Sequence, residues 1–547
     1  MRDGQKMAVI GAVCAAAVGA AGFGAYAFVG GEGTQSGNDP GVLRTSQDDS
    51  KPGAAPTGPP SATEVRTAAG AFLTAWESGD TAEAAALTDD ETAAAKALAA
   101  FTKDAGVTAV DLTEGTPAGA EVPFDVTASI THQEQTASLA YTSGLTVVRG
   151  ADGEPVVDWE PAVLHPELAE GDTLVTDAAG DPEVVTVDRD GQELTAKEYP
   201  ELAAVLADVT RRYTDSAGGE PGIVTRVVGA DGKDKKVLKK LTEGTPGTVR
   251  TTLDAGLQKA AQAALEGKAK GSAVAIRPST GEILAVASTP AGGFNSALRG
   301  SLAPGSTFKV VSASMLIEKG LASADAPHPC PKFFTHGGWK FQNLDEFEIQ
   351  GGTFRQSFAR SCNTAFISQA PELSDDDLTQ QARDLFGIGL TWSVGTGTFD
   401  GAVPVQSDAQ MAASLIGQGG VRANPLIMAS VAATVKAGAF HQPVIVPQDV
   451  DGRALATAPR PMSPALAEEL RSLMRTTATS GTAQEAMASV GGDKGGKTGS
   501  AEVDAQELPN AWFIGFSDDL AAAALIPASG HGGTNAGPVV AEILNAG

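Results

Sequence analysis

Three short polar motifs, set far apart in the chain, most constrain its fold because each predicts a different local structure. Ser306-Thr-Phe-Lys309 opens a helical pattern that Gly320 stops, with an apolar stripe that predicts burial. The polar side chains of Ser361-Cys-Asn363 can share one side only in a loop or an extended turn. Lys497-Thr-Gly499 precedes Ser500 and a second apolar run, a pattern typical of two antiparallel strands. We therefore expect a buried helix, a loop and a strand to meet at one site.

The spacing within the motifs favours the chemistry of serine acyl transfer. Residues three apart on a helix share a face, so the Lys309 amine could reach the Ser306 hydroxyl. Burial and the positive charge of Lys497 would both disfavour the ammonium form of Lys309, which could then act as the base that activates Ser306. Ser361 could relay a proton, and Asn363 could hold a substrate amide. Backbone N–H groups at the start of the helix could hold an oxyanion.

The strand motif supplies the remaining candidates. Alternation along a strand would turn Thr498 and Ser500 toward a substrate carboxylate and Lys497 the other way, toward Ser361. Gly499 would let a ligand lie close against the strand. Taken singly, the three motifs fit a solvated helix face, a turn and a strand end, and only their order and setting favour a shared site.

Composition excludes several classes of function. The chain has 547 residues with 39 Lys+Arg and 66 Asp+Glu, and the net charge of −27 disfavours nucleic acid as a partner. Its three cysteines, Cys14, Cys330 and Cys362, lack the paired spacing of a zinc site. We therefore expect no metal and no cofactor.

The beginning of the chain predicts a membrane anchor. Residues 1–6 would be a cytoplasmic tail, and residues 7–29 contain no charged side chain and are long enough to span a bilayer. A cleaved signal peptide is the alternative, because Ala25-Tyr-Ala27 resembles a cleavage site. Residues 30–61 have almost no apolar content and predict a flexible linker.

Two further regions precede the motifs. Over residues 62–164, Ala-rich helical patterns give way to alternating segments, which predicts a small α+β domain with a curved sheet. Residues 165–248 are mixed and contain the basic run 233–240, which we interpret as a solvated hairpin rather than a binding patch. His165 is interpreted as a structural residue at the junction of the two regions.

Longer strings carry a resemblance to a known family. They include Ile276-Arg-Pro-Ser-Thr-Gly-Glu, Ala303-Pro-Gly-Ser-Thr-Phe-Lys, Ser361-Cys-Asn-Thr-Ala-Phe and Gly496-Lys-Thr-Gly-Ser-Ala-Glu. With these strings the chain resembles a class B penicillin-binding protein, the monofunctional cell-wall transpeptidase type. The segment through His165-Pro-Glu-Leu resembles the nuclear-transport-factor-like domain of methicillin-resistance-type members.

The resemblance implies a multidomain α+β architecture. A single transmembrane helix would precede a cone-shaped α+β domain at 62–164 and a small mixed pedestal domain of the dimerisation type at 165–248. Residues 249–547 would form an α/β transpeptidase domain like that of penicillin-binding proteins and serine β-lactamases. The pedestal usually opens with an Arg-Gly pair, and here only Asp188-Arg-Asp-Gly191 is present.

The resemblance also implies roles for the site residues in a peptidoglycan D,D-transpeptidase. Ser306 would be the nucleophile, Lys309 its base and Ser361 a proton shuttle that Lys497 assists. Asn363, Thr498, Gly499 and Ser500 would bind substrate, and the backbone N–H groups of Ser306 and Ser500 would form the oxyanion hole. Many family members have Thr in place of Ser500, which keeps the hydroxyl. Whether Cys330 and Cys362 pair is open.

Alternatives and partners follow from the same resemblance. A D,D-carboxypeptidase or a serine β-lactamase would use the same acylation step. A β-lactamase would need a glutamate that activates water, and the candidate, Glu372, fits a helix-cap neighbour better. A non-catalytic β-lactam or muropeptide sensor would need a cytoplasmic effector, for which six residues before Met7 are too few. The expected partners are peptidoglycan stem peptides, β-lactams as covalent inhibitors, and a membrane glycan polymerase of the shape, elongation, division and sporulation family. The catalytic domain would lie outside the cell membrane.

Overall fold

The computed structural model describes residues 58–547. The predicted anchor at 7–29 and most of the predicted linker at 30–61 lie outside the described residues. The first helix of the described residues is α1 (Ala62–Glu77), where Ser61 and Glu64 form a reciprocal capping box. Among the helices of residues 58–547, none has the length and apolar character needed to cross a membrane.

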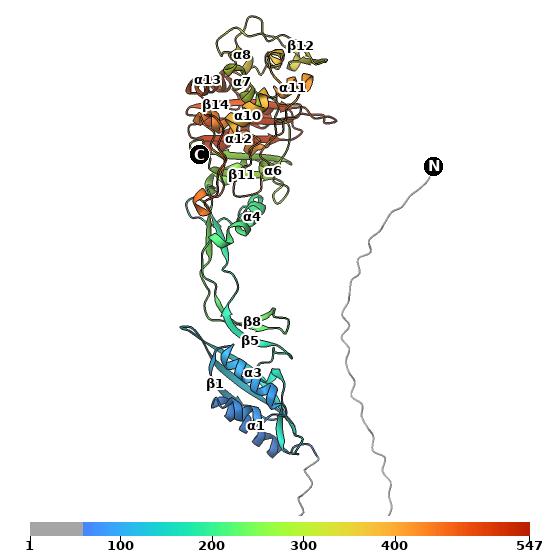
Figure 1. The fold of residues 1–547 in the computed structure, drawn as a ribbon, viewed down its shortest axis with the longest axis vertical. Coiled ribbons are helices and arrows are strands. Elements are labelled where there is room, and N and C mark those ends of the chain that lie inside the picture. The colour runs from blue at the N-terminus through green and yellow to red at the C-terminus, as the bar shows by residue number, and fades with distance from the viewer. Residues whose placement is uncertain (1–57) are drawn as a thin grey trace, which may run out of the picture. The chain divides into compact units, whose positions relative to one another are not determined.

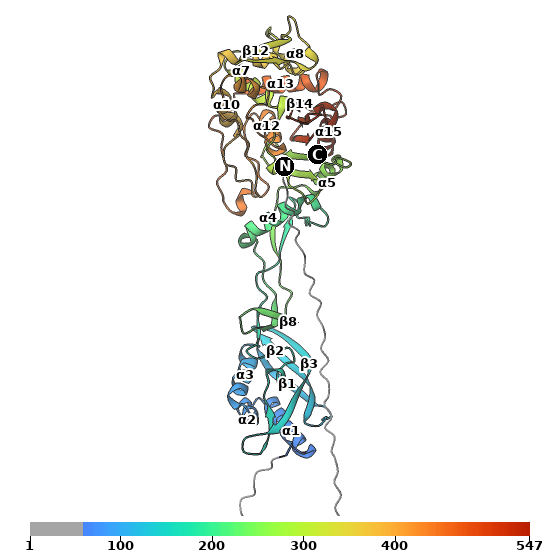
Figure 2. The same ribbon diagram turned by 90° about the vertical axis from the view of Figure 1, so that its right-hand side faces the viewer.

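The first region is an α+β unit, as predicted. Helices α2 (Thr81–Ala86) and α3 (Glu91–Lys103) follow α1. The chain then forms an antiparallel sheet in the order β1 (Val107–Glu114), β2 (Glu121–His132), β3 (Gln135–Arg149) and β4 (Pro155–Asp158). β2 alternates exposed and buried residues, so Phe124 faces inward and meets Trp76 of α1 edge to face at 6.1 Å. Figure 2 shows α1 to α3 beside this sheet.

Two small sheets and a helix follow. One sheet has the antiparallel order β5 (Thr173–Ala178), β7 (Ile223–Val228) and β8 (Asp234–Lys240), and the other pairs β6 (Val184–Val187) in parallel with β9 (Gly247–Arg250). Helix α4 (Ala203–Tyr213) lies between β6 and β7 in the sequence. The basic run lies largely on the exposed strand β8, as predicted for a solvated hairpin, and Lys235 and Lys236 pair with Asp172 and Glu167. The predicted boundaries at 165 and 248 stay predictions.

His165 is buried, as expected of a structural residue. Its ring lies 4.3 Å from the ring of Tyr141, and its Nδ1 accepts a hydrogen bond from the backbone N–H of Glu167 at 3.2 Å. Burial lowers the pKa of His165 to about 4. The imidazole is therefore neutral at physiological pH.

The C-terminal region is built on a five-stranded antiparallel sheet. Its order is β11 (Ile283–Thr289), β10 (Gly271–Ile276), β16 (Leu520–Ile526), β15 (Asn510–Ser517) and β14 (Lys494–Ala501). β10, β15 and β16 are buried along their whole length, because helices cover both faces. Helices α5 (Ala255–Ala264) and α15 (Gly537–Ala546) pack on one face (Figure 2), and α12 (Pro425–Ala437) and α13 (Pro464–Ser480) pack on the other (Figure 1 and Figure 2).

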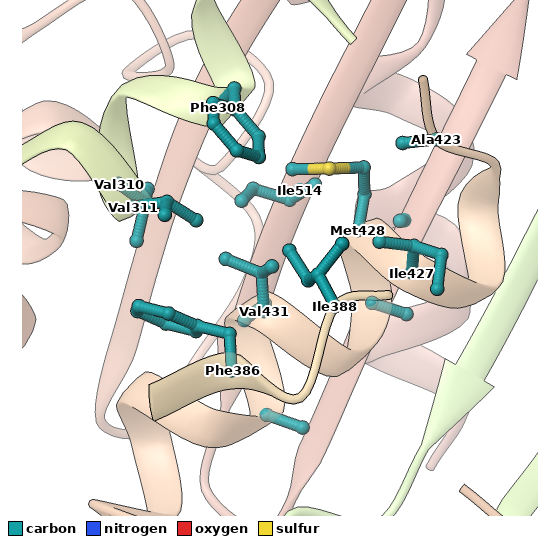
Figure 3. Close-up of a cluster of buried hydrophobic side chains, with 14 of the residues drawn as sticks. Phe308, Val310, Val311, Phe386, Ile388, Ala423, Ile427, Met428, Val431 and Ile514 are labelled. Carbon is teal, nitrogen blue, oxygen red and sulfur yellow. The ribbon is translucent and has the colours of Figure 1, made fainter. Parts of the chain in front are cut away.

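The core between helices and sheet supports the Ser306 motif. Phe308 points into a cluster with Met428 and Val431 of α12 and Ile514 of β15 (Figure 3). The predicted helix is present as α7 (Lys309–Glu318), but it is buried on nearly all sides rather than along one stripe. Ser306 itself lies in a 3₁₀ turn, η4 (Gly305–Phe308), that leads into α7, and not in the first α-helical turn as predicted. Thr307 Oγ1 donates to Pro304 O at 2.8 Å and tightens this turn.

Candidate active site

The turn that carries Ser306 lies directly against strand β14. Gly305 N donates to Gly417 O at 3.0 Å, and a Cβ atom on Gly305 would lie 2.7 Å from Ser500 O. A Cβ atom on Gly499 would lie 2.9 Å from Thr307 Cγ2 and 3.0 Å from Pro304 O. Gly499 therefore lets the strand approach the serine turn. The sequence did not indicate this contact, and the prediction that the glycine also makes room for a ligand stays a prediction.

Lys309 is fully buried at the start of α7. Its Nζ donates to Ser361 O at 2.8 Å and to Asn363 Oδ1 at 2.7 Å. Asn363 Nδ2 donates to Gln342 O at 3.0 Å, which requires Oδ1 to face the amine. These two acceptors can take both N–H bonds of a neutral amine, and the third neighbour of Nζ is the Ser361 hydroxyl at 3.5 Å. Within residues 58–547 no hydrogen bond joins Nζ to Ser306 Oγ, so the contact expected from the helical spacing is not formed in this structure.

Lys497 is the second fully buried lysine. Its Nζ donates to Ser361 Oγ at 2.9 Å and to Thr498 O at 2.9 Å, as expected from strand alternation. Lys309 Nζ lies 3.5 Å from the same Ser361 hydroxyl. The structure thus brings Lys309, Ser361, Asn363 and Lys497 into one hydrogen-bonded group.

Neither lysine has a carboxylate partner among the ion pairs of the described chain. Burial lowers the pKa of Lys497 to about 7. Burial, and after it the positive charge of Lys497, lowers the pKa of Lys309 well below its usual range. The neutral amine, the form needed to accept a proton, is therefore much more favoured at Lys309 than at an exposed lysine.

Ser361 lies in a loop between α8 (Phe354–Ala359) and α9 (Thr364–Ile367), as its motif predicts. Its φ of 59° falls in the left-handed region, which non-glycine residues rarely adopt outside functional or tightly held segments. In this conformation the Ser361 carbonyl faces Lys309 while the Ser361 hydroxyl faces Lys497.

The sequence left open whether Cys330 and Cys362 pair. In the structure these two buried cysteines form a disulfide, with a Cα–Cα distance of 6.3 Å.

Thr498 and Ser500 follow Lys497 on β14. Thr498 is buried, and its Oγ1 shares a hydrogen bond of 2.6 Å with Thr482 Oγ1, whereas Ser500 is half-buried. Thr482 and Asn343, which bonds the backbone of Asn363, are contacts that the sequence did not identify. Thr482 stands in the short string Gly481-Thr-Ala, the sequence signal that could have identified it.

Glutamates between the second and third motifs do not join this group. Glu372 is exposed at the end of a 3₁₀ turn, η6 (Ala370–Glu372). Glu468 pairs with Arg471, and Glu469 accepts a hydrogen bond from the backbone N–H of Ala324. Within residues 58–547, no cluster of three or more His, Cys, Asp or Glu side chains could hold a metal ion.

Comparisons with known proteins identify the family of this chain. A family model described as the penicillin binding protein transpeptidase domain matches residues 271–545, and one described as the NTF2-like N-terminal transpeptidase domain matches residues 64–172. Peptidoglycan D,D-transpeptidase PbpA of Mycobacterium tuberculosis is 26% identical over 485 residues, covering 75% of this chain and 95% of the relative. PbpA of Mycolicibacterium smegmatis is 28% identical over 438 residues, covering 69% and 87%.

Solved structures show the same fold. Penicillin binding protein 3 of Mycobacterium tuberculosis, in its apo form, aligns with a TM-score of 0.52 at 22% identity and covers 68% of this chain and 96% of that one. Pseudomonas aeruginosa PBP2 in complex with WCK 5153 aligns with a TM-score of 0.53 at 22% identity and covers 67% and 96%.

Replacing Lys497 should change the pH dependence of acylation. Lys497→Met removes the positive charge that lowers the pKa of Lys309, so that pKa should rise. Because acylation needs neutral Lys309, the loss of rate on acidification should begin about one pH unit higher. The rate constant for labelling by a fluorescent penicillin, measured across pH, tests this. Lys494→Met on the same strand is the matched control, because Lys494 bonds Met487 O and Val490 O instead. An unshifted acidic limb in Lys497→Met would contradict the assignment.

The disulfide should stabilise the C-terminal region. The bridge closes a loop with a sequence separation of 32, and its loss should lower the free energy of unfolding by about 2–4 kcal/mol. Urea unfolding with and without reductant measures the difference. The double variant Cys330→Ser/Cys362→Ser should unfold like the reduced chain and should not respond to reductant. Equal midpoints for the oxidised and reduced chains would refute a stabilising role.

Proposed function

Because the chain belongs to the penicillin-binding protein transpeptidase family, with the class B order of an NTF2-like domain ahead of the catalytic domain, we propose that it cross-links peptidoglycan through an acyl-enzyme on Ser306. The activity is that of a serine D-Ala-D-Ala transpeptidase. The observation that carries the residue assignment is the pair of buried lysines that share Ser361 beside the Ser306 turn. This arrangement supplies a neutral base and a proton relay without a carboxylate.

In the first step, Ser306 Oγ attacks the carbonyl carbon of the penultimate D-alanine of a stem peptide. The hydroxyl proton passes to the lone pair of neutral Lys309 Nζ after a small movement of the side chain or the turn. The backbone N–H groups of Ser306 and Ser500 hold the oxyanion, since Gly305 and Gly499 let the turn and β14 lie in contact. This step makes the C–O bond of the tetrahedral intermediate.

Collapse of the intermediate breaks the C–N bond and releases D-alanine. The leaving amine takes a proton from Ser361 Oγ, and Lys497 can replace that proton across the 2.9 Å hydrogen bond. An amine from a neighbouring peptidoglycan strand then attacks the ester and regenerates Ser306, which gives a two-step, ping-pong transfer. Thr498 and Ser500 bind the terminal carboxylate, with Thr482 orienting the Thr498 hydroxyl.

β-Lactams should enter the same pathway. The β-lactam carbonyl takes the place of the D-alanine carbonyl, and ring opening leaves a covalent ester on Ser306. In this ester the leaving amine remains attached to the acyl group, so it does not make way for an acceptor. Penicillin therefore serves as a probe of the nucleophile.

Intact mass and peptide mapping of the chain from Gly58 onward, incubated with penicillin, test the assignment. We expect a stable adduct on Ser306, none on Ser306→Ala, and release of D-alanine from a stem-peptide thioester by the unmodified chain. Rapid loss of the adduct with drug turnover would instead indicate a hydrolase such as a β-lactamase. Failure of both the adduct and the D-alanine release would refute the proposal.

We further propose that residues 7–29 anchor the protein with its catalytic domain outside the cell membrane, because this stretch lacks charge and peptidoglycan lies there. A membrane glycan polymerase is the proposed partner. A chain of the same fold, 22% identical with a TM-score of 0.54, belongs to a peptidoglycan synthase complex that coordinates polymerization and crosslinking. Fractionation of cells expressing the full chain, followed by pull-down from solubilised membranes, tests both proposals. A soluble full chain would refute the anchor, and a pull-down without a polymerase would refute the partner.

A further inference from the structure

We propose that Asn343 is a positioning residue for acylation: it holds the backbone of Asn363, and through Asn363 it holds the amine of Lys309. The inference rests on the proposed acylation of Ser306 and adds to it a residue outside the three motifs. Asn343 directly follows β13 (Trp339–Gln342), the second strand of a hairpin with β12 (Phe333–His336).

The side chain of Asn343 is buried and fully used. Its exposed fraction is 1%, Oδ1 accepts from Asn363 N at 2.7 Å and from Thr364 N at 3.0 Å, and Nδ2 donates to Pro331 O at 3.0 Å and Phe347 O at 2.8 Å. One amide therefore ties the two ends of the hairpin segment to the residue that bonds Lys309. Removal of this side chain would leave buried donors and acceptors without partners.

Asn363 is held at two points by consecutive residues. Its backbone N–H bonds the Asn343 side chain, and its Nδ2 bonds the backbone carbonyl of Gln342. These contacts fix the position of the backbone and the rotation of the amide, which together aim Oδ1 at Lys309 Nζ. A shift of Asn363 would release one of the two short contacts of the amine, and Nζ could then leave the position from which it would reach Ser306.

The disulfide joins the same two segments of the chain that Asn343 connects. It links Cys362, next to Asn363, to Cys330, next to Pro331. A disulfide limits the distance between two backbones but leaves the direction of the Asn363 N–H and of its amide free. Asn343 supplies that direction, so the bridge does not replace it.

A purely structural role would predict a different outcome, and a second buried asparagine makes the comparison possible. Asn424 is also fully buried before a helix, with Oδ1 accepting from Ile427 N at 3.0 Å and Nδ2 donating to Leu298 O and Phe399 O, both at 2.9 Å. Its bonds match those of Asn343 in kind but do not reach the lysines. Truncation of either residue should therefore cost similar stability, and only truncation of Asn343 should slow acylation.

The experiment is a double-mutant cycle measured by acylation with a fluorescent penicillin, together with thermal unfolding of each variant. Asn343→Ala should slow acylation by about 10- to 100-fold, the effect of a small misplacement of a reacting group. Asn424→Ala should acylate as fast as the unmodified chain, although its melting temperature should fall about as much as that of Asn343→Ala. In an Asn363→Ala background, Asn343→Ala should cause no further slowing, because its effect passes through Asn363.

The inference is overturned if Asn343→Ala acylates no more slowly than Asn424→Ala. It is also overturned if Asn343→Ala slows acylation equally in the Asn363 chain and in the Asn363→Ala background.

If Asn343→Ala does not fold, Asn343→Asp replaces it, because it keeps the shape and the acceptor oxygen and loses the Nδ2 donor. Its slowing must likewise vanish in the Asn363→Ala background, and persistence there overturns the inference. If the unmodified chain forms no adduct on Ser306, the proposed function fails and this inference falls with it. An adduct that forms equally fast on Asn343→Ala overturns this inference alone.

Discussion

The burial of two lysine amines without a carboxylate partner is the condition on which the rest of the site depends. A buried ammonium group is costly, so the protein interior favours the neutral amine, and at Lys309 the positive charge of Lys497 adds to this effect. The deprotonated amine that serine chemistry requires is thus favoured by the position of the lysine in the fold. The hydrogen-bond acceptors of Lys309 and Lys497 are oxygen atoms of serine, asparagine and backbone carbonyls.

This arrangement lowers the stability of the fold. Lys497 has a pKa of about 7 when folded against about 10.5 for a free lysine, so the unfolded chain binds more protons between those values. The contribution of Lys497 to stability is therefore least favourable below pH 7 and improves as the pH rises toward 10.5. The left-handed Ser361 adds a further cost. A sheet buried on both faces, the core around Phe308 and the disulfide supply the compensating stability.

Local patterns predicted much of the catalytic region, and long-range contacts account for what they missed. The buried helix after Ser306, the loop around Ser361 and the paired strands after Lys497 follow from local periodicities of two to four residues. The same patterns could not place Asn343, because nothing in its neighbourhood distinguishes it from a turn asparagine. Nor could they assign Gly499, since the atoms that require a glycine there belong to a turn nearly two hundred residues earlier. The 3₁₀ form of the Ser306 turn depends on those same contacts. The disulfide likewise needed a geometry that cysteine count alone does not supply.

The hydrophobic residues before β9 are divided between two cores. Leu174 and Val227 complete the core beneath the first sheet, whereas Tyr199, Leu206 and Val209 belong to the core that contains Phe308. Helix α4 therefore contributes to the same hydrophobic core as the five-stranded sheet, and the apolar residues of the two regions bury one another. A chain cut at residue 249 would expose an apolar surface on the catalytic half. A fragment that is to fold with its core complete should accordingly begin before β6. The predicted domain start at residue 249 is therefore too late to serve as the start of an independent catalytic fragment.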